Sequence, residues 1–78
     1  MVKIYYIHRM VTLSTSIREH RARLGLTQEE LAERVGAVRQ TIAYLERGEY
    51  MPSLALAWRL STVLNVPLTE LFTLSEEN

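Results

Sequence analysis

Residues 27–48 decide the fold, and they read TQEELAERVGAVRQTIAYLERG. Thr27 and Glu30 are spaced to cap each other's backbone amides at the start of a helix, an arrangement known as a capping box. Three apolar side chains then follow at helical spacing: Leu31, Ala32 and Val35. Gly36 can adopt the left-handed conformation that closes a helix. The first half of this stretch is therefore predicted to be a short amphipathic helix that ends at Gly36.

A second helix is predicted to follow Gly36 almost at once and to end at Gly48. Ile42 and Leu45 share its buried side. The opposite side carries the following residues: Arg39, Gln40, Ala43, Tyr44 and Arg47. Because the connection is too short for antiparallel packing, the two helices are expected to cross steeply, as in a helix-turn-helix.

Short blocks of residues occur at fixed spacing around this motif. They are Thr27-Gln28-Glu29-Glu30-Leu31-Ala32, Gly36, Arg39-Gln40-Thr41-Ile42, Leu45-Glu46-Arg47-Gly48 and Pro52-Ser53-Leu54. Together they resemble the Cro/Xre type of phage-repressor helix-turn-helix domain, over residues 17–72. The resemblance implies a compact, all-α, lambda-repressor-like domain of five helices that binds operator DNA as a symmetric dimer.

A recognition helix in the major groove presents only three or four side chains to the base edges. By geometry and by resemblance, the expected base contacts are Arg39, Gln40, Ala43 and Tyr44. Arginine suits the paired acceptors of guanine, and glutamine suits the donor and acceptor pair of adenine. Contacts to the DNA backbone are expected from Thr27, Gln28, Thr41 and Arg47.

Three other positions in the motif are distinctive. By resemblance, Arg21 and Glu46 form a partly buried ion pair that fixes their helices relative to each other. Val38 stands where the family pattern has serine or threonine, and the loss of that capping oxygen costs about 1 kcal/mol of helix stability. His20 has no second ligand near it in the sequence, so it is interpreted as structural and no metal site is predicted.

The outer helices are predicted from their caps. Ser16 and Glu19 are spaced as a second capping box, for a helix over residues 17–24 that Gly25 ends. Its inward stripe is Ile17, His20 or Arg21, and Leu24. After a loop, Ser53 is expected to cap a fourth helix over residues 54–64. Asn65 then supplies a left-handed cap.

The fourth helix is apolar on several sides, so it must bury more than one of them. Its core side is predicted to be Leu54, Ala57, Leu60 and Leu64. Trp58 has two interpretations, as a partly buried core residue or as an interface anchor. A last short helix is predicted over residues 68–72, with its apolar residues closing either the core or a dimer. The candidate dimer interface is Ile4, Tyr6, Trp58, Leu68, Leu71 and Phe72.

Residues 2–13 are rich in β-branched and aromatic side chains and predict a strand. A lone strand in a helical domain has no partner, and an unpaired edge invites another chain. Two hypotheses follow: the strand pairs across a dimer axis, or it is a disordered extension. The expected division is an extension over residues 1–15, the DNA-binding domain over residues 16–73 and a frayed tail over residues 74–78.

Composition limits the classes that remain. The chain has 78 residues, 47% of them hydrophobic, which suits one small domain that oligomerisation would help to stabilise. It contains no cysteine and no apolar run of ~20 residues, so a soluble, cytoplasmic protein is expected. The formal net charge is zero, but residues 1–59 hold all nine Lys and Arg, so a basic side is compatible with the acidic C-terminal part.

The functional hypothesis from the sequence is a transcriptional regulator that represses a promoter as a homodimer on an inverted repeat. Two alternatives remain: the antitoxin of a toxin–antitoxin pair, whose N-terminal strand grips a toxin, and a protein-interaction module that has lost DNA binding. An enzyme is not expected, since no arrangement of Cys/His or Ser/His/Asp residues and no phosphate loop stands out. No cofactor is predicted.

Overall fold

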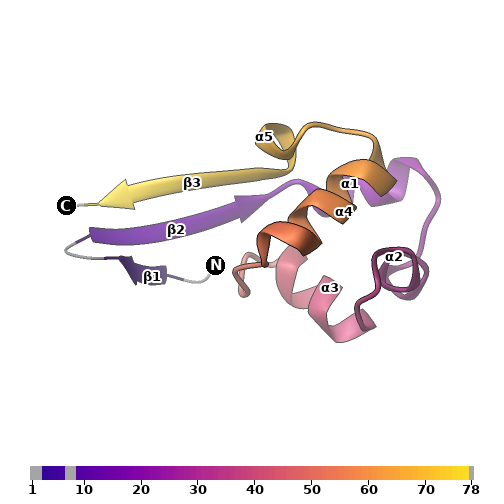
Figure 1. Cartoon of the computed structure of the whole chain (residues 1–78), viewed down its shortest axis with the longest axis horizontal. Coiled ribbons are helices and arrows are strands. Elements are labelled where there is room, and N and C mark those ends of the chain that lie inside the picture. Colours follow the sequence, from indigo (N-terminus) through magenta and orange to yellow (C-terminus); the bar gives the residue numbers. More distant parts are fainter. Residues whose placement is uncertain (1–2, 7–8, 78) are drawn as a thin grey trace.

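The computed structural model describes the backbone of residues 3–6 and 9–77 and the side chains of residues 11–76. The helices are α1 (Ile17–Arg23), α2 (Gln28–Val35), α3 (Arg39–Glu46), α4 (Leu54–Leu64) and α5 (Leu68–Leu71). The strands are β1 (Lys3–Tyr6), β2 (Arg9–Thr15) and β3 (Phe72–Glu77). The helices cluster at one end of an elongated molecule of 39 × 22 × 19 Å, and the sheet extends from them (Figure 1).

The five predicted helices are present, but the expectation of an all-α domain is wrong. The strands form one antiparallel sheet in the order β1-β2-β3. Strand β2 pairs with β3 so that Leu13 lies opposite Leu74 and Thr15 lies opposite Phe72. The tail predicted to fray is therefore a strand up to Glu77. Helix α5 returns to the start of α1, where the Ser16 amide donates to the Leu71 carbonyl at 3.0 Å, so β3 begins beside the end of β2.

The N-terminal strand prediction needs a related correction. Residues 2–13 were predicted as one strand without a partner in its own chain, whereas β1 and β2 pair with each other and β2 pairs with β3. The partner that the sequence prediction sought in a second copy is supplied by residues 72–77 of the same chain. Residues 1, 2, 7, 8 and 78 lie outside the described part.

The predicted capping box at the start of α2 is confirmed. The Thr27 hydroxyl accepts the Glu30 amide at 3.0 Å, and the Glu30 carboxylate accepts the Thr27 amide at 2.9 Å. These hydrogen bonds hold the pKa of Glu30 below its usual value. At the other end, Gly36 has a φ of 71°, the left-handed conformation predicted for the helix stop.

The second predicted capping box, at α1, is wrong. Ser16 does not cap the helix with its side chain, and its hydroxyl instead donates to the Glu70 carbonyl at 2.6 Å. Since α1 follows β2 directly and abuts α5, the hydroxyl satisfies an end carbonyl of α5. Helix α1 ends at Arg23, and Leu24, predicted to face inward, is 48% exposed.

The core lies between the helices, and α2 and α3 contribute much of it. Its largest fully buried side chains are Leu13, Ile17, Leu31, Ile42, Leu45, Leu60, Leu71 and Val35. On α4 the buried side is Leu56, Ala57, Leu60 and Leu64, so the prediction for Leu54 is wrong. Leu54 is 77% exposed because it is the first residue of α4 and projects beyond the core. Trp58 is 65% exposed, which excludes the core interpretation.

Candidate nucleic-acid interface

The interface candidate is the outward side of α3. Ile42 and Leu45 are fully buried and fasten one side of α3 to the core. The connection between α2 and α3 consists of only three residues, Gly36, Ala37 and Val38, so both helices belong to one compact unit. With one side buried, the opposite side of α3 must face outward.

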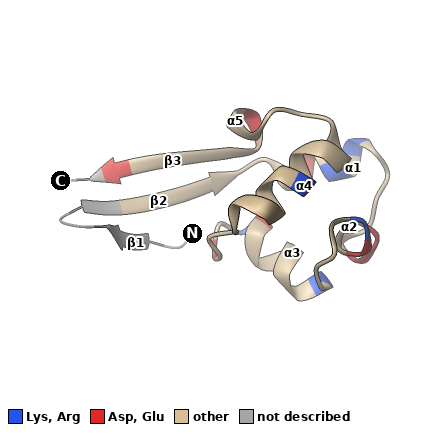
Figure 2. Cartoon of the chain, viewed as in Figure 1, with Lys and Arg blue, Asp and Glu red and all other residues tan. Residues whose placement is uncertain are grey.

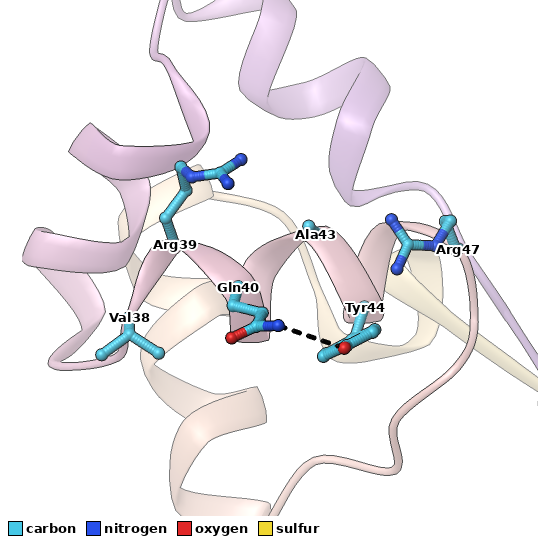
Figure 3. Close-up of a pocket in the computed structure, with 6 residues that line it drawn as sticks. All are labelled: Val38, Arg39, Gln40, Ala43, Tyr44 and Arg47. Atoms are coloured by element: carbon cyan, nitrogen blue, oxygen red, sulfur yellow. Dashed lines mark hydrogen bonds between the residues drawn. The ribbon is translucent and has the colours of Figure 1, made fainter.

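The outward side of α3 lines a surface depression of about 690 Å³. Figure 3 shows its lining residues along this helix, with Arg39 at the start and Arg47 just beyond the end. The full lining is Val38, Arg39, Gln40, Ala43, Tyr44 and Arg47. The four predicted base contacts thus lie together, and three of them are exposed, while Ala43 is half-buried.

Two contacts hold the Tyr44 ring in place on this surface. The Gln40 side-chain amide donates to the Tyr44 hydroxyl at 3.2 Å, drawn as a dashed line in Figure 3. The Arg47 guanidinium lies over the Tyr44 ring, 5.1 Å from its centroid, and its Nε donates to Glu49 at 2.7 Å. Because these groups are exposed, water and DNA compete for the same hydrogen bonds. Replacing these contacts with contacts to DNA therefore costs little free energy.

The predicted phosphate contact Gln28 connects this surface to the interior. Its Nε2 donates to Glu46 at 3.0 Å, and its Oε1 accepts from Arg39 Nη1 at 3.3 Å. Gln28 is half-buried at the first turn of α2. Its side chain is therefore held between a carboxylate and the first arginine of α3.

The structure brings Arg21 and Glu46 together in a two-pronged ion pair. Arg21 Nε donates to Glu46 Oε2 at 2.6 Å, and Nη2 donates to Oε1 at 3.2 Å. The side chains are only 15% and 5% exposed, and the hydrogen bond to Glu46 raises the pKa of Arg21. Arg21 Nη1 also donates to the Leu26 carbonyl at 2.8 Å. This pair joins α1, the following loop and α3, and Gln28 extends the network to α2.

The remaining predicted backbone contacts lie at the ends of the two motif helices. Thr27 is exposed and uses its hydroxyl in the α2 cap, whereas Thr41 is half-buried on α3. Val38, at the cap position of α3, has extended backbone and supplies no side-chain cap, as expected for valine. It is 65% exposed.

Sequence reasoning missed Arg18. This exposed residue on α1 lines a second hollow, of about 300 Å³, beside the α3 surface. The hollow is lined by Arg18, Arg21, Gln28, Ala43, Glu46 and Arg47. The spacing of Arg18 and Arg21 contained the signal, because residues three apart share a helix face.

The candidate dimer residues differ in how exposed their side chains are. Trp58 is exposed, and Leu68 and Phe72 are half-buried. Leu71 is 1% exposed in the core of its own chain, so its prediction as an interface residue is wrong. The predictions for Ile4 and Tyr6 concern side chains outside the described set. An apolar hollow of about 250 Å³ is lined by Leu13, Met51, Pro52, Leu54, Ala57, Phe72 and Leu74.

Charge is unevenly distributed over the fold. Figure 2 shows Lys and Arg on α1, α2, α4 and at the start of α3, whereas acidic residues lie on α2, on α5 and in the far part of β3. Among the described residues, no group of three or more His, Cys, Asp or Glu could hold a metal ion. In the same residues, no helix is both long and apolar enough to cross a membrane.

Comparison with known proteins places this fold in a family. A family model described as helix-turn-helix, of the Cro/C1 type, matches residues 17–71. A protein named an HTH-type transcriptional regulator from Methanothermobacter thermautotrophicus is 56% identical over 66 residues, which are 83% of this chain and 96% of that protein. A cryptic phage CTXphi transcriptional repressor, RstR, from Vibrio cholerae is 35% identical over 83% of this chain and 59% of its own length.

A solved structure agrees with these sequence matches. The restriction-modification controller protein C.AhdI from Aeromonas hydrophila superimposes with a TM-score of 0.64 and 37% sequence identity. The match covers 69% of this chain and 82% of that one. The short α2–α3 connection, the family match and this structural likeness agree, and the chain belongs to the Cro/C1-type helix-turn-helix family.

Proposed function

We propose that this protein is a sequence-specific DNA-binding transcriptional regulator that acts as a homodimeric repressor on an inverted-repeat operator. The observation that carries the proposal is the outward side of α3, where Arg39, Gln40 and Tyr44 are exposed on a helix whose other side is locked into the core. A rigid helix with long hydrogen-bonding side chains matches the dimensions and chemistry of the major groove. The names of two relatives, an HTH-type transcriptional regulator and a phage transcriptional repressor, support the regulatory part of this proposal.

In this proposal, Arg39 donates two hydrogen bonds to guanine and Gln40 pairs with adenine. Ala43 allows the helix to approach closely or meets a thymine methyl group. Tyr44 completes the reading surface, and it releases Gln40 from their mutual 3.2 Å hydrogen bond when a base replaces the hydroxyl. Since both side chains are exposed, this exchange costs little.

Contacts to phosphates set the register of the helix in the groove. Gln28 stands at the first turn of α2, where backbone amides also point outward. Arg47 stands at the other end of α3, and Thr27 and Thr41 are further candidates. These residues flank the reading side chains, which is the arrangement that positions a helix without adding sequence preference.

A second copy is proposed to cover the apolar surface formed by α4, the loop before it and β3. Leu54 and Trp58 lie one helical turn apart and are 77% and 65% exposed, and Leu74 is 57% exposed. Symmetric pairing buries the same patch on both copies, and small domains gain stability from such burial.

Two reading helices related by a two-fold axis require a palindromic operator. Occupation of a promoter would then repress it, the activity named for the phage relative.

The test is selection of bound duplexes from a random library at two salt concentrations. Wild type is compared with Arg39→Ala and Gln40→Ala, and Arg34→Ala is the control, since Arg34 is an exposed arginine outside the α3 surface. An enriched palindrome that loses definition at different positions in the first two variants supports the proposal. Wild type that enriches no site at either salt concentration would refute it.

A further inference from the structure

The hollow beside the reading surface contains an unusual concentration of positive charge. Its 300 Å³ are lined by three arginines, from α1 and from the end of α3, and by one carboxylate, Glu46. Glu46 is 5% exposed and accepts hydrogen bonds from Arg21 and Gln28. The carboxylate is therefore already neutralised. Of the two other arginines, Arg47 shares its charge with exposed Glu49, and Arg18 has no carboxylate partner among the described residues.

Arg18 is not explained by the stability of the protein. Within the described part of the chain, it has no hydrogen-bond or ion-pair partner. It occupies the first turn of α1, where the helix dipole disfavours a positive charge. Arg18 therefore gains no stabilising interaction from its own helix, and its side chain lines a hollow. This combination suggests that its charge binds a ligand outside the chain.

Arg47 still has donors to offer. Its Nε is used by Glu49, but a guanidinium carries five N–H groups, and the four on its terminal nitrogens are not needed for that bond. The side chain is 53% exposed. Arg47 and Ala43 line both this hollow and the α3 depression, so the two sites are continuous along the helix.

From this geometry we infer that Arg18 and Arg47 clamp one phosphodiester group of the DNA backbone in the hollow, with the Gln28 side chain beside it. The inference rests on the proposed DNA-binding function and adds Arg18, from α1, as a residue that positions the reading helix. Planar guanidinium groups match phosphate oxygens in geometry and charge, and the small Ala43 side chain leaves the space for them. A phosphate held here fixes α1 and α3 together against one strand.

The first test measures affinity for the selected duplex and for a random duplex over a range of salt concentrations. Arg18→Ala is expected to weaken both about tenfold at low salt and to lower the slope of log affinity against log salt by about 1. Arg18→Lys, which keeps the charge, should retain most of the slope. Arg34→Ala makes the same change of charge away from the hollow and should leave the slope closer to wild type.

A second test locates the phosphate. Neutral methylphosphonate groups are placed one at a time along the half-site, and the loss of affinity is measured for wild type and each variant. One position is expected to weaken wild type and Arg34→Ala more than it weakens Arg18→Ala, because that variant keeps only Arg47 as a charged partner for this phosphate. The double-mutant comparison separates a direct contact from a general change in charge or stability.

The outcomes distinguish the inference from the function on which it rests. If wild type binds the duplex but Arg18→Ala shows the same salt slope and the same sensitivity at every phosphate, the Arg18 site is overturned and the proposed function stands. If wild type binds no duplex, both fail. If the slope falls by about 1 and the neutralisation of one phosphate costs Arg18→Ala less affinity than wild type, the Arg18 contact is established.

Discussion

Two surfaces of this small protein carry exposed side chains but differ in chemistry. The α3 surface presents hydrogen-bonding side chains that contact one another, as Gln40 does with Tyr44. The surface of α4 and β3 presents Leu54, Trp58 and Leu74, which are apolar and more than half exposed. Exposure alone therefore does not indicate which kind of partner a surface binds. The chemistry of the exposed groups indicates a polar partner for the α3 surface and an apolar partner for the surface of α4 and β3.

The two surfaces also differ in how they are supported. Behind α3 stands a network of ion pair and hydrogen bonds that runs from Arg21 through Glu46 and Gln28 to Arg39. The apolar surface is a continuation of the core through half-buried Phe72. A reading surface needs fixed positions for each donor, whereas an apolar surface needs mainly area. Changes confined to one surface should consequently leave the role of the other intact.

The largest effect is expected from Trp58→Glu, which puts a charge on the apolar surface. We expect loss of dimerisation and a fall in operator affinity of about 10²–10⁴-fold, because two half-sites no longer act together. Base preference within a half-site should not change. Sedimentation gives the oligomeric state and fluorescence anisotropy gives the affinity. Thr69→Glu, at an exposed position of α5, is the charge-matched control. A Trp58→Glu protein that remains dimeric would refute this role for the surface.

Glu46→Ala tests the support of the reading surface. Removal of this carboxylate leaves Arg21, 15% exposed, without its charge partner, and we expect unfolding free energy to fall by about 3 kcal/mol. Urea denaturation measures it. Glu49→Ala breaks the exposed pair with Arg47 and should cost at most about 1 kcal/mol. Equal losses in the two variants would show that the network does not support α3.

Ala43→Leu tests the reading surface by placing a larger side chain in the depression on α3. Because Ala43 lines both hollows on α3, a larger side chain should hold the helix away from the groove and remove about 2 kcal/mol of binding free energy, equivalent to one base contact. The dimer should persist, as seen by sedimentation. Ala55→Leu, at an exposed position of α4, makes the same change elsewhere. Unaltered DNA affinity in Ala43→Leu would mean that α3 does not enter the groove as proposed.

The smallest effect is expected from Val38→Ser. A serine at the start of α3 supplies the side-chain cap that valine lacks, which should raise stability by about 1 kcal/mol. Thermal unfolding measures the change. Val38→Ala has no capping oxygen and should not reproduce it. If alanine stabilises as much as serine, removal of the exposed apolar side chain, and not capping, is the cause.

Local signals in the sequence were enough to predict most of the helical unit. The α2 capping box depends on residues three apart, and the stops at Gly36 and Asn65 depend on single residues with positive φ. Each of these features is decided within one turn of chain, so a sequence pattern contains them. The same locality explains why the prediction for Ser16 failed, since its hydroxyl is taken by Glu70, 54 positions away.

The sheet could not be predicted for the same reason. Residues 72–77 lack any partner in their neighbourhood and resemble a polar tail, and they become a strand only because α5 brings them beside β2. Burial of Leu13 at this junction then stabilises the pairing. The interaction joins two ends of the chain, and its energy depends on the folded position of everything between them.

The hollow lined by Arg18 also depends on contacts between residues that are far apart in the chain, whereas the motif helices do not. Sequence by itself determined the motif helices, the polar side of α3 and the family, because helical periodicity and caps act over a few residues. Only the tertiary structure decided that Arg18 of α1 and Arg47, just after α3, line one hollow, that Leu71 is buried and that Trp58 is exposed. Those facts depend on how helices pack, and packing is set by contacts between residues far apart in the chain.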